Sequence, residues 1–233
     1  MALYVIGDTH FSSDGRYSMD VFGDAWKAYT EKLADSFSKL TPDDRLVICG
    51  DFSWAMDLEE ALPDFEFLDR FKGRKILLKG NHDYWWDTVK KMKAFLSVHG
   101  IETIDFLHNN FFDFEDFLLC GTRGWVYDKS NADLQDIKML KREVMRLEHS
   151  LTAARDHSEN KELLVFLHYP PVYGDTQSDE IMSVLKKFGV RRCFYGHLHA
   201  ESIRHAFEGA RCGIDFKLVS SDALNFEPFL ISK

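Results

Sequence analysis

Short apolar runs, each ending in glycine or a polar residue, recur along the chain and predict a set of buried β-strands. They cover residues 3–7, 45–50, 75–79, 163–167 and 193–196, and the polar residues that follow them are Asp8, Thr9, His10, Asp51, Asn81, His82, Asp83, His168, His197 and His199. In open α/β sheets, ligands bind beyond the carboxyl ends of the strands. We therefore expect these polar side chains to converge at one edge of a sheet.

The segments between these runs show the apolar spacing of helices. Helices are expected near residues 25–40, 58–71, 85–98, 131–156 and 179–188. Residues 101–121 are rich in Phe and predict sheet, with a hairpin turn at residues 108–110, and the tail from 214 to 231 alternates like an extended strand. Strands that first alternate with helices and then dominate the second half imply two packed mixed sheets flanked by helices.

No internal repeat, low-complexity segment or linker interrupts this pattern, so a single domain over residues 1–233 is expected. A chain of that length is long enough to bury a full core. Residues 126–160 form the one large insertion between the polar clusters. The insertion fits a lid, a dimer contact or a solvated flank, and the oligomeric state does not follow from the sequence.

Amino-acid composition and net charge limit the class of protein, its partners and its compartment. Hydrophobic residues make up 45% and charged residues 29%, as in ordinary globular proteins. The formal net charge of −9 weighs against a broad electropositive surface, so no stable nucleic-acid complex is expected, although bound cations would still allow a nucleotide or phosphoester substrate. Four cysteines without a C-x-x-C pair, no signal peptide and no long apolar run predict a cytoplasmic protein with reduced thiols and no membrane association.

The polar residues at the strand ends are of the types that bind transition metals. Seven of them offer oxygen and imidazole ligands without a thiolate, namely Asp8, His10, Asp51, Asn81, His168, His197 and His199. Such a set suits manganese, iron or zinc better than a calcium or magnesium cage, and it differs from a structural zinc site built from cysteines. A pair of divalent ions needs a bridging carboxylate and terminal ligands on each side. The sequence therefore predicts a two-metal site.

The order of these clusters resembles the five motifs of the calcineurin-like metallophosphoesterases. The matching residues are Asp8-x-His10, Gly50-Asp51, Gly80-Asn81-His82-Asp83, His168 and Gly196-His197-x-His199, spread over residues 8–199. The resemblance implies a four-layer α/β/β/α sandwich and two divalent transition-metal ions, manganese first, with iron or zinc as alternatives. It also implies that one ion is held by Asp8, His10, Asp51 and His199 and the other by Asp51, Asn81, His168 and His197, with Asp51 bridging.

The same resemblance implies a catalytic role for His82. Its imidazole would protonate or stabilise the leaving oxygen, with Asp83 holding the ring, while a metal-bridging hydroxide attacks phosphorus from the opposite side. The implied enzyme is a phosphohydrolase that cleaves a phosphoester of a small molecule or nucleotide, with a phosphodiester as the first expectation. A phosphomonoesterase, a nucleotide-type pyrophosphatase, a nuclease and a catalytically silent scaffold on the same fold remain alternatives.

Two departures from the protein phosphatases of this family bear on the substrate. Those enzymes extend the second motif to G-D-x-V-D-R-G, whose Arg clamps the substrate phosphate, whereas this chain continues with Phe52-Ser53-Trp54-Ala55-Met56-Asp57 and has no Arg there. Their third motif also has Glu at the position of Asp83. Both differences count against a phosphoprotein phosphatase.

Contacts with the substrate must then come from other residues. Arg123, in the segment Gly121-Thr122-Arg123-Gly124-Trp125, is a candidate for a bidentate phosphate contact, with a surface ion pair as its alternative. Trp54, Trp85 and Trp125 are candidates to stack on a nucleobase or to cover an apolar leaving group, with core packing as their alternative.

Overall fold

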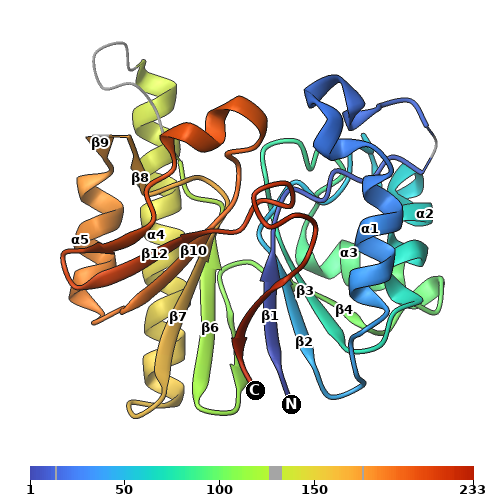
Figure 1. Cartoon of the computed structure of the whole chain (residues 1–233). Coiled ribbons are helices and arrows are strands. Elements are labelled where there is room, and N and C mark those ends of the chain that lie inside the picture. Colours follow the sequence, from blue (N-terminus) through green and yellow to red (C-terminus); the bar gives the residue numbers. More distant parts are fainter. Residues whose placement is uncertain (14, 126–132, 175) are drawn as a thin grey trace.

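Two β-sheets lie against each other in the centre of the molecule, and helices cover their outer faces (Figure 1). The computed structural model describes residues 1–13, 15–125, 133–174 and 176–233. Buried side chains from both sheets form a shared core between them, for example Val5 and Val47 from one sheet and Leu164 and Phe166 from the other. The predicted arrangement of two mixed sheets flanked by helices is confirmed.

The strands follow the apolar runs of the sequence. The first sheet contains β1 (Leu3–Ile6), β2 (Arg45–Ile48), β3 (Arg74–Leu78), β4 (Ile104–Leu107) and β13 (Phe229–Ser232). The second sheet contains β5 (Phe111–Phe114), β6 (Phe117–Thr122), β7 (Glu162–Leu167), β10 (Arg192–Tyr195), β11 (Gly209–Arg211) and β12 (Ile214–Leu218). A separate two-stranded ribbon pairs β8 (Val172–Tyr173) with β9 (Thr176–Gln177).

The strand order places the carboxyl ends of the central strands at one edge of each sheet. The first sheet has the order β13-β1-β2-β3-β4, with β1 to β4 parallel, and the second has the order β11-β12-β10-β7-β6-β5, with β12, β10, β7 and β6 parallel. Near this edge the two sheets are joined through Gly7. Its N–H donates to the carbonyl of Val219 (2.6 Å), and its carbonyl accepts from the N–H of Ser221 (2.9 Å).

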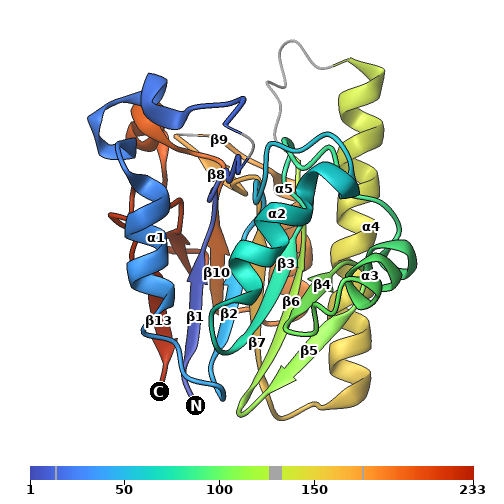
Figure 2. The same cartoon turned by 90° about the vertical axis from the view of Figure 1, so that its right-hand side faces the viewer.

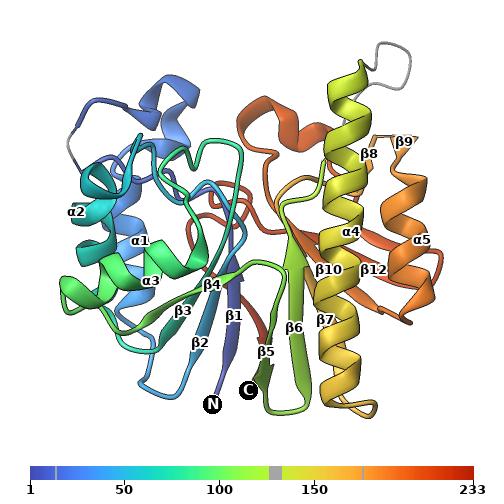
Figure 3. The same ribbon diagram turned by 180° about the vertical axis from the view of Figure 1, so that it is seen from behind.

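Helices complete the outer layers. The first sheet is covered by α1 (Tyr29–Phe37), α2 (Leu58–Asp69) and α3 (Val89–Val98), as Figure 2 shows. The second sheet is covered by α4 (Leu134–His157) and α5 (Asp179–Lys187), seen in Figure 3. Successive strand residues point to opposite faces, so that Val47 of β2 enters the shared core while its neighbour Ile48 packs under the helices.

Some predicted elements differ from the structure. The helix expected at residues 25–40 is shorter, because Ala28 has a left-handed φ of 52° and separates α1 from a 3-10 helix at Asp24–Trp26. The helix expected at 85–98 begins only after Thr88, whose side chain caps it. The hairpin expected at residues 108–110 is wrong, because the chain there crosses from β4 in the first sheet to β5 in the second.

The long helix α4 is the described part of the 126–160 insertion. It was expected from residue 131, and residues 131 and 132 lie outside the described residues. It buries Leu147 and Leu151 against the second sheet, so it forms a flank of that sheet. No helix within the described residues is long and apolar enough to cross a membrane. All four cysteines carry free thiols, of which only that of Cys212 is exposed.

Candidate metal centre

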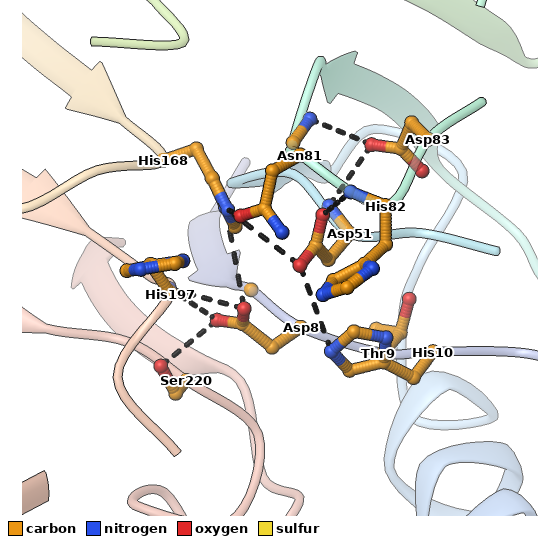
Figure 4. A network of polar contacts seen from close by, with 12 residues as sticks. Asp8, Thr9, His10, Asp51, Asn81, His82, Asp83, His168, His197 and Ser220 are labelled. Carbon is orange, nitrogen blue, oxygen red and sulfur yellow. Dashed lines mark hydrogen bonds and ion pairs between the residues drawn. The ribbon is translucent and has the colours of Figure 1, made fainter. Parts of the chain in front are cut away.

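Six of the seven predicted metal ligands converge where the carboxyl ends of the two sheets meet (Figure 4), and the ring of the seventh, His199, lies 5.2 Å from that of His10. The first sheet supplies Asp8 and His10 after β1, Asp51 after β2 and Asn81 after β3, and the second supplies His168 after β7 and both His197 and His199 after β10. Neither sheet alone carries the whole set. The cluster therefore depends on the packing of one sheet against the other.

The backbone of this edge is strained. Left-handed φ angles occur at Asp8 (55°), His10 (46°), Asp51 (50°) and His197 (72°). For residues with a Cβ atom such a conformation costs on the order of 1 kcal/mol or more each. Gly80 packs so tightly beneath Asp51 that a Cβ atom there would lie 2.0 Å from Asp51 Oδ1. Strain that collects in this way is typical of a functional site.

Asp8 and Asp51 are the buried carboxylates at the centre of the cluster. Asp8 Oδ2 accepts hydrogen bonds from the backbone N–H of His197 (2.9 Å) and the hydroxyl of Ser220 (2.8 Å). Asp51 Oδ1 accepts one from the backbone N–H of His82 (2.8 Å). Burial raises the pKa of both carboxyl groups, to about 6 for Asp51, and the charge of Asp51 raises the pKa of Asp8 further. A bound cation would relieve this repulsion.

His168 and Asn81 bring two acceptor atoms face to face. His168 Nδ1 lies 3.0 Å from the carbonyl oxygen of Cys49, so the ring proton is on Nδ1. Nε2 is then an acceptor, yet it lies 2.7 Å from Asn81 Oδ1 and 3.6 Å from Asp51 Oδ2. Burial lowers the pKa of His168 to about 3, which keeps the ring neutral. A cation is the partner that satisfies facing acceptors of this kind.

The other imidazoles leave ring nitrogens unpartnered. Both ring nitrogens of His10 and the Nδ1 of His199 are buried without a hydrogen-bond partner among the described residues. The two rings lie 5.2 Å apart, and His10 Nε2 is 3.7 Å from Asp51 Oδ2. The ring of His197 lies 5.0 Å from that of His168. Burial lowers the pKa of His10, His197 and His199, so these rings are neutral, as metal ligands must be.

This set of donors fits a divalent metal ion. Asp8, Asp51 and His168 each offer one ligand atom, and the three atoms lie within 4.8 Å of one another. Polar atoms buried without a partner cost free energy, and a cation would provide the missing partner for the carboxylates and the imidazoles alike. The mixture of oxygen and nitrogen donors matches the preferences of manganese, iron and zinc.

Asp83 does not hold the imidazole of His82, and that expectation is wrong. Its fully buried carboxylate accepts five hydrogen bonds, from the backbone N–H groups of Gly80, Asp51, Phe52 and Ser53 and from the indole N–H of Trp85. Burial and the charge of Asp51 raise the pKa of Asp83 to about 7, while its backbone donors oppose that rise. Since every partner donates, the ionised form fits best. Asp83 thus fixes the loop that carries Asp51.

His82 lies among aromatic rings at the rim of the cluster. Its ring centroid is 4.4 Å from that of Trp54 and 5.7 Å from that of His10. Its Nδ1 is buried and has no hydrogen-bond partner among the described residues. Burial lowers the pKa of His82, whereas the negative charge of Asp51 raises it. The ring is therefore placed beside the cluster by packing and by its own backbone bond to Asp51.

The candidate substrate contacts fall into different environments. Trp54 stacks on His10 with a centroid distance of 4.8 Å. Trp85 is 2% exposed and packs in the core, so its expected contact with substrate does not match the structure. Trp125 is half-buried, and its indole N–H donates to Asp136 (3.1 Å). The guanidinium of Arg123 lies 3.9 Å from the carboxylate of the buried Glu143, measured from Nη2 to Oε1. The Nε of Arg123 is buried without a hydrogen-bond partner among the described residues.

Several residues that support the cluster were not identified from the sequence. Ser220 donates to Asp8, the hydroxyl of Tyr29 donates to the carbonyl of His10 (2.7 Å), and Asp222 accepts from the backbone N–H of Ala200 (2.6 Å). Ser220 and Asp222 belong to a polar segment shortly after an apolar strand, β12. That is the same signal that located the other strand-end residues, and it could have found them. Tyr29 lies on a helix, and the sequence offers no comparable signal for it.

Comparison with known proteins agrees with this geometry. A model of the calcineurin-like phosphoesterase family matches residues 1–201, which include all of the predicted ligands. No match was found among the curated proteins. The family is one in which divalent metal ions serve phosphoester hydrolysis, in keeping with the donors that converge here.

Solved structures show the same fold at low sequence identity. The chain is similar to a protein of unknown function, AQ665 from Aquifex aeolicus, with 17% identity and a TM-score of 0.52 over 98% of this chain and 95% of the other. It is similar to a phosphopantetheinyl hydrolase from Mycobacterium tuberculosis, with 15% identity and a TM-score of 0.51 over 94% and 88%. TT1561 of Thermus thermophilus has 11% identity and a TM-score of 0.57 over 98% and 96%. At such identities the likeness establishes the fold alone.

Proposed function

Because the chain belongs to the calcineurin-like phosphoesterase family, and is thus a metal-dependent phosphoesterase, we propose that it uses two divalent metal ions to hydrolyse a phosphoester of a small molecule or nucleotide. The observation that carries this proposal is the convergence of two buried carboxylates, one amide and four imidazoles at the junction of the two sheets. The two ions would be manganese first, with iron or zinc as alternatives.

The proposed ligands divide into two groups that share one carboxylate. The first ion would be held by Asp8, His10, Asp51 and His199, and the second by Asp51, Asn81, His168 and His197. The unpartnered nitrogens of His10 and His199 support the first group. The facing acceptors of His168 and Asn81 support the second. When bound, such ions activate water and stabilise the charge that develops on the phosphoryl oxygens.

His82 would assist the leaving group. In the hydrolysis, water adds to phosphorus, the ester P–O bond breaks, and the departing oxygen takes up a proton. The ring of His82 lies beside the cluster without being tied to Asp83, and its Nδ1 lacks a partner among the described residues. A neutral ring would stabilise the negative charge on the leaving oxygen through its N–H group, and a protonated ring, which the charge of Asp51 favours and burial opposes, would donate the proton. The hydrogen bond from its backbone N–H to Asp51 fixes the main chain of His82 beside the cluster.

Arg123 would contact a phosphoryl oxygen from the side of the second sheet. Among the smaller effects on the cluster, the charge of Arg123 lowers the pKa of both Asp51 and His168. The carbonyl of Arg123 accepts hydrogen bonds from the N–H groups of His168 (3.1 Å) and Tyr169 (2.8 Å), which ties its backbone to the ligand loop. Glu143 neutralises part of the charge but leaves the Nε of Arg123 unused.

A phosphodiester is the preferred substrate class within this proposal. The loop after Asp51 presents the ring of Trp54, stacked on His10, and carries Ala55 where protein phosphatases of this family have a phosphate-clamping Arg. A site with fewer cations suits the single charge of a diester better than the double charge of a monoester. A phosphomonoester remains the alternative, and so does a nucleotide-type pyrophosphate.

Hydrolysis of chromogenic esters tests the proposal. Metal-stripped protein would be supplied with Mn, Fe, Zn, Ni or Mg and assayed with para-nitrophenyl phosphate, its bis ester and its phenylphosphonate ester. We expect activity that depends on a transition metal, favours the bis ester over the monoester and disappears in Asp51→Asn. Preference for the monoester would overturn the diester assignment. Absence of metal binding would overturn the proposal itself.

A further inference from the structure

Large apolar side chains that are exposed to solvent occur in the segments that carry the proposed ligands of the first sheet. Five of them are Tyr17 (48% exposed), Val21 (81%), Phe22 (42%), Met56 (52%) and Tyr84 (54%). They lie in the loops that follow β1, β2 and β3, the same three loops that carry Asp8, Asp51 and Asn81. Exposed apolar groups that cluster around a functional site mark a surface that binds something apolar.

Three of these side chains are aromatic, and each lies against the ring of a proposed ligand or of a residue that packs on one. Tyr17 stacks on Trp54 with centroids 5.3 Å apart and an interplanar angle of 26°, and Trp54 in turn stacks on His10. Phe22 meets His199 edge-on at 5.2 Å. These contacts use one face or edge of each ring, and the exposed fractions show that much of the remaining ring surface is open to solvent.

Tyr84 extends the rim next to the proposed leaving-group residue. Its ring meets that of His82 edge-on at a centroid distance of 6.1 Å. The backbone N–H of Tyr84 also donates to the carbonyl of His82 (2.8 Å), which keeps the two residues together in one tight turn. An apolar group on the leaving oxygen would thus meet aromatic surface as soon as that oxygen approaches His82.

The two sides of the centre differ in character. The aromatic rim, formed by Tyr17, Phe22 and Tyr84, belongs to loops of the first sheet, including the segment that precedes α1 (Figure 1). The second sheet contributes Arg123, whose carbonyl accepts hydrogen bonds from the N–H groups of His168 (3.1 Å) and Tyr169 (2.8 Å). A substrate can therefore place its phosphoryl anion toward Arg123 and an apolar group toward the rim. Such polarity orients an ester in one direction only.

We propose that Tyr17, Phe22 and Tyr84 form a subsite for an aryl or heteroaryl group attached to the leaving oxygen of the phosphoester, an inference that rests on the proposed function. Aromatic rings bind other rings by stacking and edge-to-face contact, which adds to the free energy gained from the buried area. The heteroaryl class includes nucleoside bases, for which protein rings form sequence-tolerant platforms. The subsite thus selects substrates by the leaving group rather than by the phosphate.

A pair of matched esters tests the subsite. One ester would carry an aryl alcohol and the other a fluorinated alkyl alcohol of the same pKa, so that bond cleavage is equally demanding in both. The measured quantity is the ratio of kcat/KM for the aryl ester to that for the alkyl ester. We expect this ratio to fall by about 3- to 10-fold in each of Tyr17→Ala, Phe22→Ala and Tyr84→Ala.

The control is Phe229→Ala, which removes a ring of 37% exposure from β13, outside the three loops. We expect this variant to keep the wild-type ratio. An unchanged ratio in all three rim variants, or equal losses on both esters, would overturn the subsite while leaving the proposed function intact. Failure of the wild-type protein to hydrolyse either ester with any metal would overturn the proposed function and the subsite with it. A nucleoside ester assayed in the same way distinguishes a base from a simple aryl group.

Discussion

The carboxylate of Asp83 is the anchor of the loop that carries Asp51. All five of its partners donate hydrogen bonds, so an amide in its place would set an N–H group against other N–H groups. We expect Asp83→Asn to lower the free energy of unfolding by about 3 kcal/mol, because buried donors lose their acceptor. Urea unfolding followed by circular dichroism measures this change.

The matched control for Asp83 is Asp87→Asn, which replaces a carboxylate on the surface a few residues along the chain. Asp87 pairs with Lys91 at 2.7 Å in a solvent-exposed position, where ion pairs contribute little. We expect a much smaller loss of stability in this variant. Equal stability of Asp83→Asn and the wild-type protein would mean that Asp83 accepts its hydrogen bonds as a neutral acid.

The His82→Ala variant distinguishes a catalytic role of the imidazole from a role in metal binding. The backbone N–H of residue 82 holds Asp51 and is retained in His82→Ala, so we expect the variant to bind as much metal per chain as the wild-type protein. Without a proton donor, turnover of esters with poor leaving groups should fall by about 10²- to 10⁴-fold, and that of nitrophenyl esters by much less. Metal analysis of the purified variant together with kcat on the two kinds of ester decides this. A parallel loss of metal would show that the imidazole is a ligand.

For single residues, the sequence predicts which side chains reach the site better than it predicts which atoms they contact there. The strand ends brought all seven proposed ligands to one cluster, since parallel strands deliver their carboxyl ends to a shared edge. The pattern could not show which atoms Asp83 would contact, or that Trp85 would turn into the core to bond it. Those outcomes depend on rotamers and on backbone N–H groups exposed by left-handed turns, which residue type alone does not specify.

Lys75 links two elements, α2 and β3. Its side chain is fully buried at the start of β3, and its Nζ donates to the carbonyl oxygens of Phe71 and Gly73 in the turn that follows α2. Burial lowers the pKa of Lys75 to about 8, below its ordinary value of 10.5. Between these two pH values the unfolded chain binds more protons than the folded chain at this site. Stability should therefore rise with pH across that window.

Comparison with Lys75→Met isolates this effect. We expect the free energy of unfolding of the wild-type protein, relative to that of the variant, to increase from about pH 8 to pH 10.5 and to be constant below pH 8. Chemical unfolding of both proteins at half-unit steps of pH measures the difference. Parallel curves over the whole range would contradict a lowered pKa for this lysine.

Elements were predictable where one local signal decided them. Apolar runs located the central strands, and helical spacing located α2 and α5 within a few residues. Helix starts moved because caps decide them, as Thr88 does for α3. The hairpin predicted at residues 108–110 is wrong because a polar turn between two strands has the same local sequence pattern whether the strands pair with each other or belong to different sheets. The choice between the sheets rests on long-range packing, which the local pattern does not contain.

In the whole molecule, the candidate metal centre lies at the junction where the two sheets are joined to each other. The chain passes from β12 in the second sheet through Ser220 and Ser221 to β13 in the first, and on the way Ser220 donates to Asp8. Ligands on both sides of the junction, such as Asp51 and His168, lie 3.6 Å apart. Anything that binds both therefore fastens one sheet to the other. A metal ion at this place should act on stability as well as on catalysis.

Thermal unfolding with and without metal tests this coupling. An ion that binds only the folded chain stabilises it by about 2.7 kcal/mol at 100 times its Kd, so chelation should lower Tm and Mn should restore it. We expect Asp51→Asn to lose this response, and Asp113→Asn, which alters a surface ion pair with Lys161, to keep it. In the presence of chelator, we expect the Tm of Asp51→Asn to be at least as high as that of the wild-type protein. The reason is that the substitution removes one of two acids that are buried together. The same Tm with and without metal would show that the two sheets are not joined through a bound ion.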